Sequence, residues 1–335
     1  MMSLRLTTVA LWTGLFATVA ATSLPAFAEP QTAPPWAYPV IDPAVKLFAD
    51  DGPKTLPGST ASFIWPQLYN TMFAADWYPG DHPAMPAMVA HGAAPDVFAC
   101  GMCHQPNGRG RPENASLAGL PAPYILQQLA DMKAGSRHSS EPGTSPQVRM
   151  VSSATHIPDS DAQEAAAYFA SLPAPPPPRV VETATVPRTT LIFGSVRVPV
   201  PDGGTEPIGQ RVIEVPEDVE RVKLHDPHAG FVAYVPLGSI AKGSAIVTTG
   251  GDKTIACATC HGANLLGQKV GDVVVPPIAG RSAIYIVRQL YDFRHGARAG
   301  AQSALMQPVV AGLDLDDMIA IAAYVASLPS QVAQK

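Results

Sequence analysis

The chain has 335 residues, of which 47% are hydrophobic and 15% are charged, and its formal net charge is −5. This length suits two domains with linkers, and the mild negative charge without a basic stripe disfavours nucleic acid as a partner. The 36 prolines indicate extended, irregular segments around compact cores rather than one large sheet.

The N-terminus has the pattern of a secretory signal peptide, which we place at residues 1–28. Arg5 supplies a positive charge, an apolar stretch runs from Val9 to Ala21, and Pro25–Ala28 ends in a small-X-small cleavage pattern. An uncleaved anchor is the alternative, but the apolar stretch is short for a span of about 20 residues. We therefore expect the mature protein to begin near Glu29 and to be periplasmic in a bacterium.

Residues 29–80 form a predicted extension rich in proline and aromatic residues. It holds Trp36, Trp65 and Trp77, which are all the tryptophans of the mature chain. One interpretation is that the extension wraps the two domains that follow it and packs there, since exposed aromatic side chains are costly on a secreted protein. The other is that it forms a docking surface for a dehydrogenase or an oxidase.

Two Cys-X-X-Cys-His motifs use all four cysteines of the chain. They are Cys100-Gly101-Met102-Cys103-His104 and Cys257-Ala258-Thr259-Cys260-His261. This pentapeptide is the attachment signature of c-type haem. Two thiols at this spacing can bond to the two vinyl groups of one porphyrin, and the next imidazole can reach its iron. We predict two covalent haems, attached through Cys100, Cys103, Cys257 and Cys260 and ligated by His104 and His261.

Other interpretations of the cysteines are weaker. A disulfide framework is typical of small, cysteine-dense chains, unlike this one. A four-thiolate zinc site needs its two Cys-X-X-Cys pairs about 15–20 residues apart, whereas these pairs lie 157 positions apart. A thioredoxin-type redox pair would require neither the following histidine nor a second copy.

The motifs belong to an internal repeat, which predicts two helical domains at residues 81–173 and 239–335. The two halves end with similar sequences, Ala166–Pro173 and Ala322–Pro329. Apolar residues at helical spacing, or a closing proline, indicate helices in each half. The expected helices are Met85–His91, Tyr124–Leu129 and Ala166–Leu172 in the first half, and Lys242–Thr248, Tyr285–Leu290 and Ala322–Leu328 in the second.

Residues 174–238 form an insert between the two domains. It begins with Pro175–Pro178, which predicts a stiff extended spacer. Strand-like patches come next, at Thr189–Val198 and Gln210–Val215. As with residues 29–80, packing on the haem domains and docking of a partner are both possible roles for this segment.

The repeat also points to a sixth iron ligand in each half. Met150 lies 22 positions before Leu172, and Met306 lies 22 positions before Leu328. A single methionine usually fills space in a core, but matching positions in both halves predict that Met150 and Met306 are axial ligands. His138 and His156 are alternatives to Met150. Met102 is expected to pack beside its own motif, and His295 carries no specific signal.

Each half resembles a class I cytochrome c domain, and the tandem resembles the dihaem c4-type cytochromes. The matching pieces are the two motifs, Leu117–Gly119 with Ile278–Gly280, and Ser303–Pro308. In this family a proline carbonyl helps to orient the ligating histidine. Pro276 occupies that position in the second half, but Ala115 does so in the first. We therefore expect a different contact on His104, and a lower potential for the first haem, whose Met150 has more polar neighbours.

The resemblance implies a mainly α protein that carries single electrons. A neutral thioether ligand raises the potential relative to a second histidine, and six-coordinate iron leaves no position open for a substrate. The expected partners are redox proteins: a dehydrogenase, a quinol-oxidising or other membrane complex, or a terminal oxidase. The alternative is a dihaem, peroxidase-like enzyme in which one iron opens a coordination site.

Overall fold

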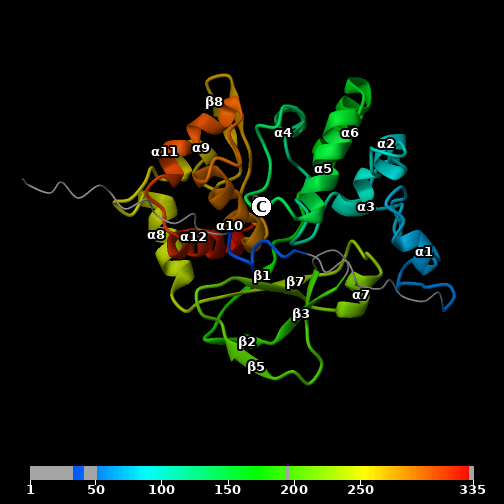
Figure 1. The fold of residues 1–335 in the computed structure, drawn as a ribbon, viewed down its shortest axis with the longest axis horizontal. Helices are drawn as coiled ribbons and strands as arrows, with labels where there is room; N and C mark the ends of the chain where they lie inside the picture. The colour runs from blue at the N-terminus through cyan, green and yellow to red at the C-terminus, as the bar shows by residue number, and fades with distance from the viewer. Residues whose placement is uncertain (1–32, 41–50, 193–195, 332–335) are drawn as a thin grey trace, which may run out of the picture. The chain divides into compact units, whose positions relative to one another are not determined.

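The computed structural model describes residues 33–40, 51–192 and 196–331. The predicted signal peptide at 1–28 lies outside these residues, and the described residues belong to a compact unit that begins at Ala33. Within them no helix is both long and apolar enough to cross a membrane. The predicted fold class is confirmed: two helical domains are accompanied by short strands (Figure 1).

The first domain is built on α4 (Ala122–Lys133), which packs against α5 (Ser145–His156) and α6 (Asp159–Ser171). Two short helices, α2 (Ala87–Ala90) and α3 (Cys100–His104), complete it. Gly101 lets α3 approach its neighbours closely, because a Cβ there would lie 2.8 Å from the Cβ of Ala74 and 3.0 Å from the carbonyl oxygen of Val89. The backbone of the first motif therefore packs directly against the segments that contain Ala74 and Val89.

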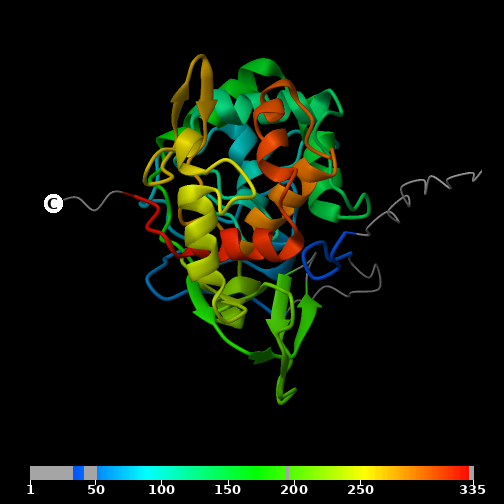
Figure 2. The same cartoon turned by 90° about the vertical axis from the view of Figure 1, so that its left-hand side faces the viewer.

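The second domain repeats this arrangement and adds a hairpin. Its elements are α8 (Ser239–Thr249), α9 (Ala258–His261), β8 (Gln268–Val270), β9 (Val273–Val275), α10 (Ala283–Arg294), the 3₁₀ helix η2 (Ala301–Leu305), α11 (Gln307–Val310) and α12 (Leu315–Ser327). Figure 2 shows α8 crossing α12. Gly243 permits this crossing, since a Cβ at that position would lie 1.9 Å from the carbonyl oxygen of Ala320. Lys242 and Lys253 both pair with the fully buried Asp317 at the start of α12.

The insert contains the predicted strands and several more. Its elements are β1 (Arg179–Glu182), β2 (Thr185–Pro187), β3 (Thr189–Ile192), β4 (Val196–Pro199), β5 (Thr205–Pro207), β6 (Ile213–Pro216), α7 (Val219–Lys223) and β7 (Phe231–Val235). One sheet has the order β1-β7-β6, with β1 parallel and β6 antiparallel to β7. This sheet lies against α12 and α10 of the second domain. The other pairs, β2 with β5 and β3 with β4, are antiparallel.

The extension is packed against the rest of the chain, but its buried tryptophans contact the insert and not a haem domain. Trp65, on α1 (Trp65–Leu68), and Trp77 belong to one buried cluster. The indole nitrogen of Trp77 donates a hydrogen bond of 2.8 Å to the carbonyl of Leu224, just after α7. Upstream, the Tyr38 hydroxyl donates to Asp292 on α10 at 2.7 Å.

Replacement of Trp77 tests how much this packing stabilises the protein. The side chain is 1% exposed, so Trp77→Ala should lower the free energy of unfolding by about 3–5 kcal/mol. Leu237→Ala is the control, because Leu237 is 68% exposed, and it should change that free energy by less than about 0.5 kcal/mol. Urea denaturation followed by circular dichroism measures both, and equal losses would argue against a buried anchor at Trp77.

Candidate haem-binding sites

The first motif lies in the wall of an apolar cavity. Cys100, Cys103 and His104 reach it from α3, and Met150 reaches it from α5. The rest of this wall is mainly apolar and includes Val97, Leu117, Ile125, Leu129, Ile157, Ala166 and Phe169. The structure therefore brings together the four residues that the sequence assigns to the first haem.

His104 is arranged as a metal ligand. Its Nδ1 lies 2.7 Å from the carbonyl oxygen of Ala115. Because a carbonyl only accepts, Nδ1 must carry the proton, which leaves a lone pair on Nε2. That Nε2 atom is buried without a hydrogen-bond partner among the described residues. Desolvation lowers the pKa of His104 and so keeps the ring neutral. An iron atom at this point would satisfy an otherwise costly buried nitrogen.

His261 is held in the same way in the second domain. Its Nδ1 lies 2.8 Å from the carbonyl oxygen of Pro276, and burial lowers the pKa of the ring. The expectation of a different contact on His104 is therefore wrong. The acceptor is a backbone carbonyl, which Ala115 supplies as well as Pro276 does. Cys257 and Met306 both pack against the core cluster of this second domain.

The cysteine environments favour thioethers over thiolate chemistry. All four cysteines are free of disulfides. Desolvation raises the pKa of Cys100 to about 12 and that of Cys257 to about 11, so these thiols keep their protons at neutral pH. Among the described residues, His, Cys, Asp and Glu form no group of three or more able to hold a metal ion. Addition of a neutral S–H group across a vinyl bond suits this apolar wall.

The structure favours Met150 over the alternative ligands His138 and His156. His138 and His156 are exposed, and each ring makes a contact with a nearby backbone carbonyl. Neither histidine lines the cavity of the first motif. Met102 is buried with its sulfur 3.6 Å from Sγ of Cys103, as expected for a packing residue. His295 stacks on Tyr291 at 3.9 Å between ring centroids.

The first site has one apolar end and one end with charged side chains. His104 and Met150 also line a second cavity, which reaches three arginines and three acids: Arg137, Arg197, Arg288, Glu113, Glu214 and Asp292. A haem has its vinyl groups on one edge and its two propionates on the opposite edge. With the cysteines at one end and arginines at the other, the residues present fit a haem whose propionates point toward the arginines.

The two domains meet through equivalent arginines. Arg137 and Arg298 lie 161 positions apart in the repeat and face each other in an isolated antiparallel bridge. Arg298 donates to Gln128 of the first domain at 2.7 Å, and Arg137 donates to the equivalent Gln289 of the second domain at 3.2 Å. Neither arginine forms an ion pair with a carboxylate in the described parts of the chain. Two cationic side chains, one buried and one partly buried, therefore lie where the domains meet.

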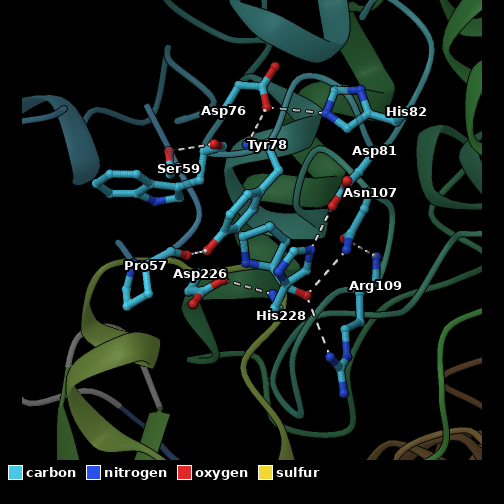
Figure 3. Close-up of polar contacts among 12 residues, drawn as sticks. Pro57, Ser59, Asp76, Tyr78, Asp81, His82, Asn107, Arg109, Asp226 and His228 are labelled. Atoms are coloured by element: carbon cyan, nitrogen blue, oxygen red, sulfur yellow. Dashed lines mark hydrogen bonds and ion pairs between the residues drawn. The ribbon is translucent and has the colours of Figure 1, made fainter. Parts of the chain in front are cut away.

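Loops outside the two repeats hold the segment that comes after the first motif. Figure 3 shows Asn107 and Arg109 directed toward the insert, where both donate to the carbonyl of Pro227. In the same loop, His228 pairs with Asp81 of the first domain at 2.6 Å and stacks on Tyr78 of the extension at 4.0 Å. Sequence reasoning missed this support, because the contacts join segments more than 100 residues apart.

Comparisons with known proteins agree with this geometry. Residues 89–173 and 240–329 match a family model described as cytochrome c. The cytochrome c4 of Azotobacter vinelandii is 27% identical over 250 residues, or 74% of this chain and 91% of the relative. The thiosulfate dehydrogenase electron acceptor of Stutzerimonas stutzeri is 39% identical over 111 residues, which cover 32% of this chain and 49% of that protein.

Two solved structures match the chain with TM-scores below 0.5. Reduced recombinant cytochrome c4 from Pseudomonas stutzeri matches with a TM-score of 0.44 and 24% identity, covering 68% of this chain and 93% of that one. A thiosulfate dehydrogenase from Marichromatium purpuratum matches with a TM-score of 0.45 and 27% identity, covering 73% of this chain and 39% of that one.

His225, in the same loop of the insert as Pro227 and His228, should make the stability of the protein depend on pH. Burial, followed by the charge of Arg111, lowers its pKa well below the usual value. The unfolded chain takes up a proton near pH 6.5 but the folded chain does not, so stability is lost as the pH falls below about 6.5, by up to about 1.4 kcal/mol per pH unit. His225→Asn should remove this contribution and flatten the acid side of the stability curve.

Urea denaturation at several pH values between 5 and 8 measures the effect. The difference in free energy of unfolding between wild type and His225→Asn at pH 8 gives the cost of the substitution itself. Any change in that difference at lower pH gives the contribution of His225 protonation. Asn suits the position because the backbone there has a φ of 57°, a conformation that Asn tolerates. Parallel curves for the two proteins between pH 5 and 8 would show that His225 does not carry this dependence.

Proposed function

Because this chain belongs to the cytochrome c family and is an electron-transfer protein with covalently bound haem, we propose that it carries single electrons through two haems in the periplasm. The observation that carries the proposal is the cavity of the first motif, where the unpartnered Nε2 of His104 shares an apolar wall with Cys100, Cys103 and Met150. The count of two haems is supported by the second motif and by the second match to the family model.

We propose His104 with Met150, and His261 with Met306, as the axial ligands. Support for Met150 comes from the cavity it shares with His104, and from the exposure of the two competing histidines. Support for Met306 comes from its repeat position and from its packing on the core of the second domain. With both axial positions filled, the chemistry that the haem supplies when bound is one-electron transfer.

The surrounding residues have separate tasks in this proposal. The carbonyls of Ala115 and Pro276 fix the ring orientation and the protonated nitrogen of the two histidines. The apolar wall excludes water and disfavours the additional charge of ferric iron, which raises the potential. The partly buried arginines at the other end of the first site would hold carboxylates in their ionised form.

The proposed partners are redox proteins outside the cytoplasm. The likeness of one segment to a thiosulfate dehydrogenase electron acceptor favours a dehydrogenase as the electron donor. A membrane complex or a terminal oxidase is the proposed acceptor. A direct test is to mix the reduced protein with each candidate acceptor and follow reoxidation of the haem by stopped-flow absorbance.

The number of haems is checked by intact mass spectrometry. The mature wild-type protein should show two haem additions, because its four cysteines form two attachment pairs. A variant with both Cys257→Ala and Cys260→Ala should show one addition. A single addition in fully matured wild-type protein would contradict the proposal.

Removal of either methionine should lower the potential of the haem in its own domain. Met306→Ala and Met150→Ala each remove a soft ligand that stabilises ferrous iron, and each should let carbon monoxide or cyanide bind to that iron. Spectroelectrochemistry gives the potentials, and the absorbance changes on ligand addition show which site has opened.

Matched controls come from methionines that are buried but not proposed as ligands. Met132 lines the cavity that reaches the arginines of the first site, and Met318 lies in the core of the second domain. Met132→Leu and Met318→Leu should leave both sixth positions closed, since Leu fills a similar volume. Normal potentials and no ligand binding in Met150→Ala would exclude Met150 as a ligand, and the same holds for Met306→Ala.

A further inference from the structure

We propose that Arg197, on β4 of the insert, binds a propionate of the first haem. A segment outside both family matches would then tune one haem of the pair. The inference rests on the proposed function, because it takes the first domain to hold a haem. Arg197 lines the cavity that His104 and Met150 also line, although it lies 93 positions after His104 and 47 after Met150 in the sequence.

Arg197 lies in the wall of this cavity together with its strand neighbour Val196. Successive side chains of a strand point to opposite faces. Val196 and Val198 are buried in one cluster with Val222 and Phe231, so Arg197 lies on the other face of β4. Its Nη1 atom donates to Oγ1 of Thr189 on the paired strand β3 at 2.9 Å. This bond anchors the guanidinium group and leaves its other N–H groups available.

The acids of this cavity already have partners. Glu214 accepts from the hydroxyl of Ser282 at 2.7 Å, and Asp292 accepts from Tyr38 at 2.7 Å. Glu113 lies 2.8 Å from Arg111. Among the described residues, Arg197 forms no ion pair with a carboxylate.

The other arginines at this end of the cavity also lack acid partners. Their hydrogen bonds go to neutral amides and carbonyls. Arg137 donates to Gln128 and Gln289, and Arg288 donates to the carbonyls of Ala37 and Pro112. Burial lowers the pKa of Arg197, and its neighbours Arg211 and Glu206 act on it in opposite directions. An ionised propionate would give these arginines the carboxylate partner that they lack.

This contact gives the two haems different surroundings. The chain has one insert, and the strands β3 and β4 have no equivalent in the described repeat of the second domain. A cation next to a propionate disfavours the charge of ferric iron and holds the propionate ionised. Arg197 should therefore raise the potential of the first haem, against the effect of the polar residues around Met150.

The test compares Arg197→Gln with Arg197→Lys in the full-length, haem-loaded protein. Spectroelectrochemistry between pH 6 and 9 gives both potentials, and the step of the first haem is the one that Met150→Ala displaces. Arg197→Gln should shift that step to lower potential. It should also make the step fall as the pH rises, because the propionate now releases its proton within this range. Arg197→Lys should restore the wild-type value at each pH, while the step of the second haem stays constant.

Arg188→Gln is the matched control, because Arg188 is an exposed arginine of the same insert and does not line the cavity. It makes the same change of charge and should leave both steps in place. The proposal is overturned if the potential of the first haem in Arg197→Gln equals the wild-type value at every pH. It is also overturned if Arg188→Gln shifts that potential by the same amount. The proposed function fails separately, if the mass of the wild-type protein shows no haem on the first motif.

Discussion

The contact between two equivalent arginines where the domains meet, one buried and one partly buried, is the interaction on which the rest of the arrangement depends. Arg137 and Arg298 pair through their backbones, and their guanidinium groups contact equivalent glutamines across the boundary. Buried guanidinium groups without acid partners are costly. Arg137 lines the first cavity, where a haem propionate would give it a carboxylate partner. Together with Arg197 and Arg288 it marks one end of the first site, and the cysteines mark the other.

The two motif histidines have similar backbone contacts but different surroundings. The histidines of both motifs are fixed by a backbone carbonyl at nearly the same distance, so the asymmetry between the sites does not arise there. It arises from the insert and the extension. The insert contacts the residues that follow the first motif, and both segments line the end of the cavity that carries the arginines. The peroxidase-like alternative gains no support, since Met150 lies in the cavity of the first motif and the relatives are named as cytochromes c4 or as an electron acceptor.

Short-range patterns carried most of what could be predicted from the sequence. The motifs, the helices with apolar residues at regular spacing and the strands near residues 189–215 are local signals, and the structure contains these elements. Helix α5 was not predicted, because its polar sequence has no clear apolar periodicity. The packing of Trp77 on Leu224 and the entry of Arg197 into the cavity could not be predicted either, because both depend on contacts between distant segments. The error at Ala115 came from treating a backbone interaction as if it depended on the side chain.

A crystal structure of the mature, haem-loaded protein would test the central claim most directly, through the position of the first haem's propionates. The account predicts that they lie at the boundary between the domains, within hydrogen-bonding distance of at least one of Arg137, Arg197 and Arg288. Propionates directed into solvent, with all three guanidinium groups beyond hydrogen-bonding distance, would contradict it.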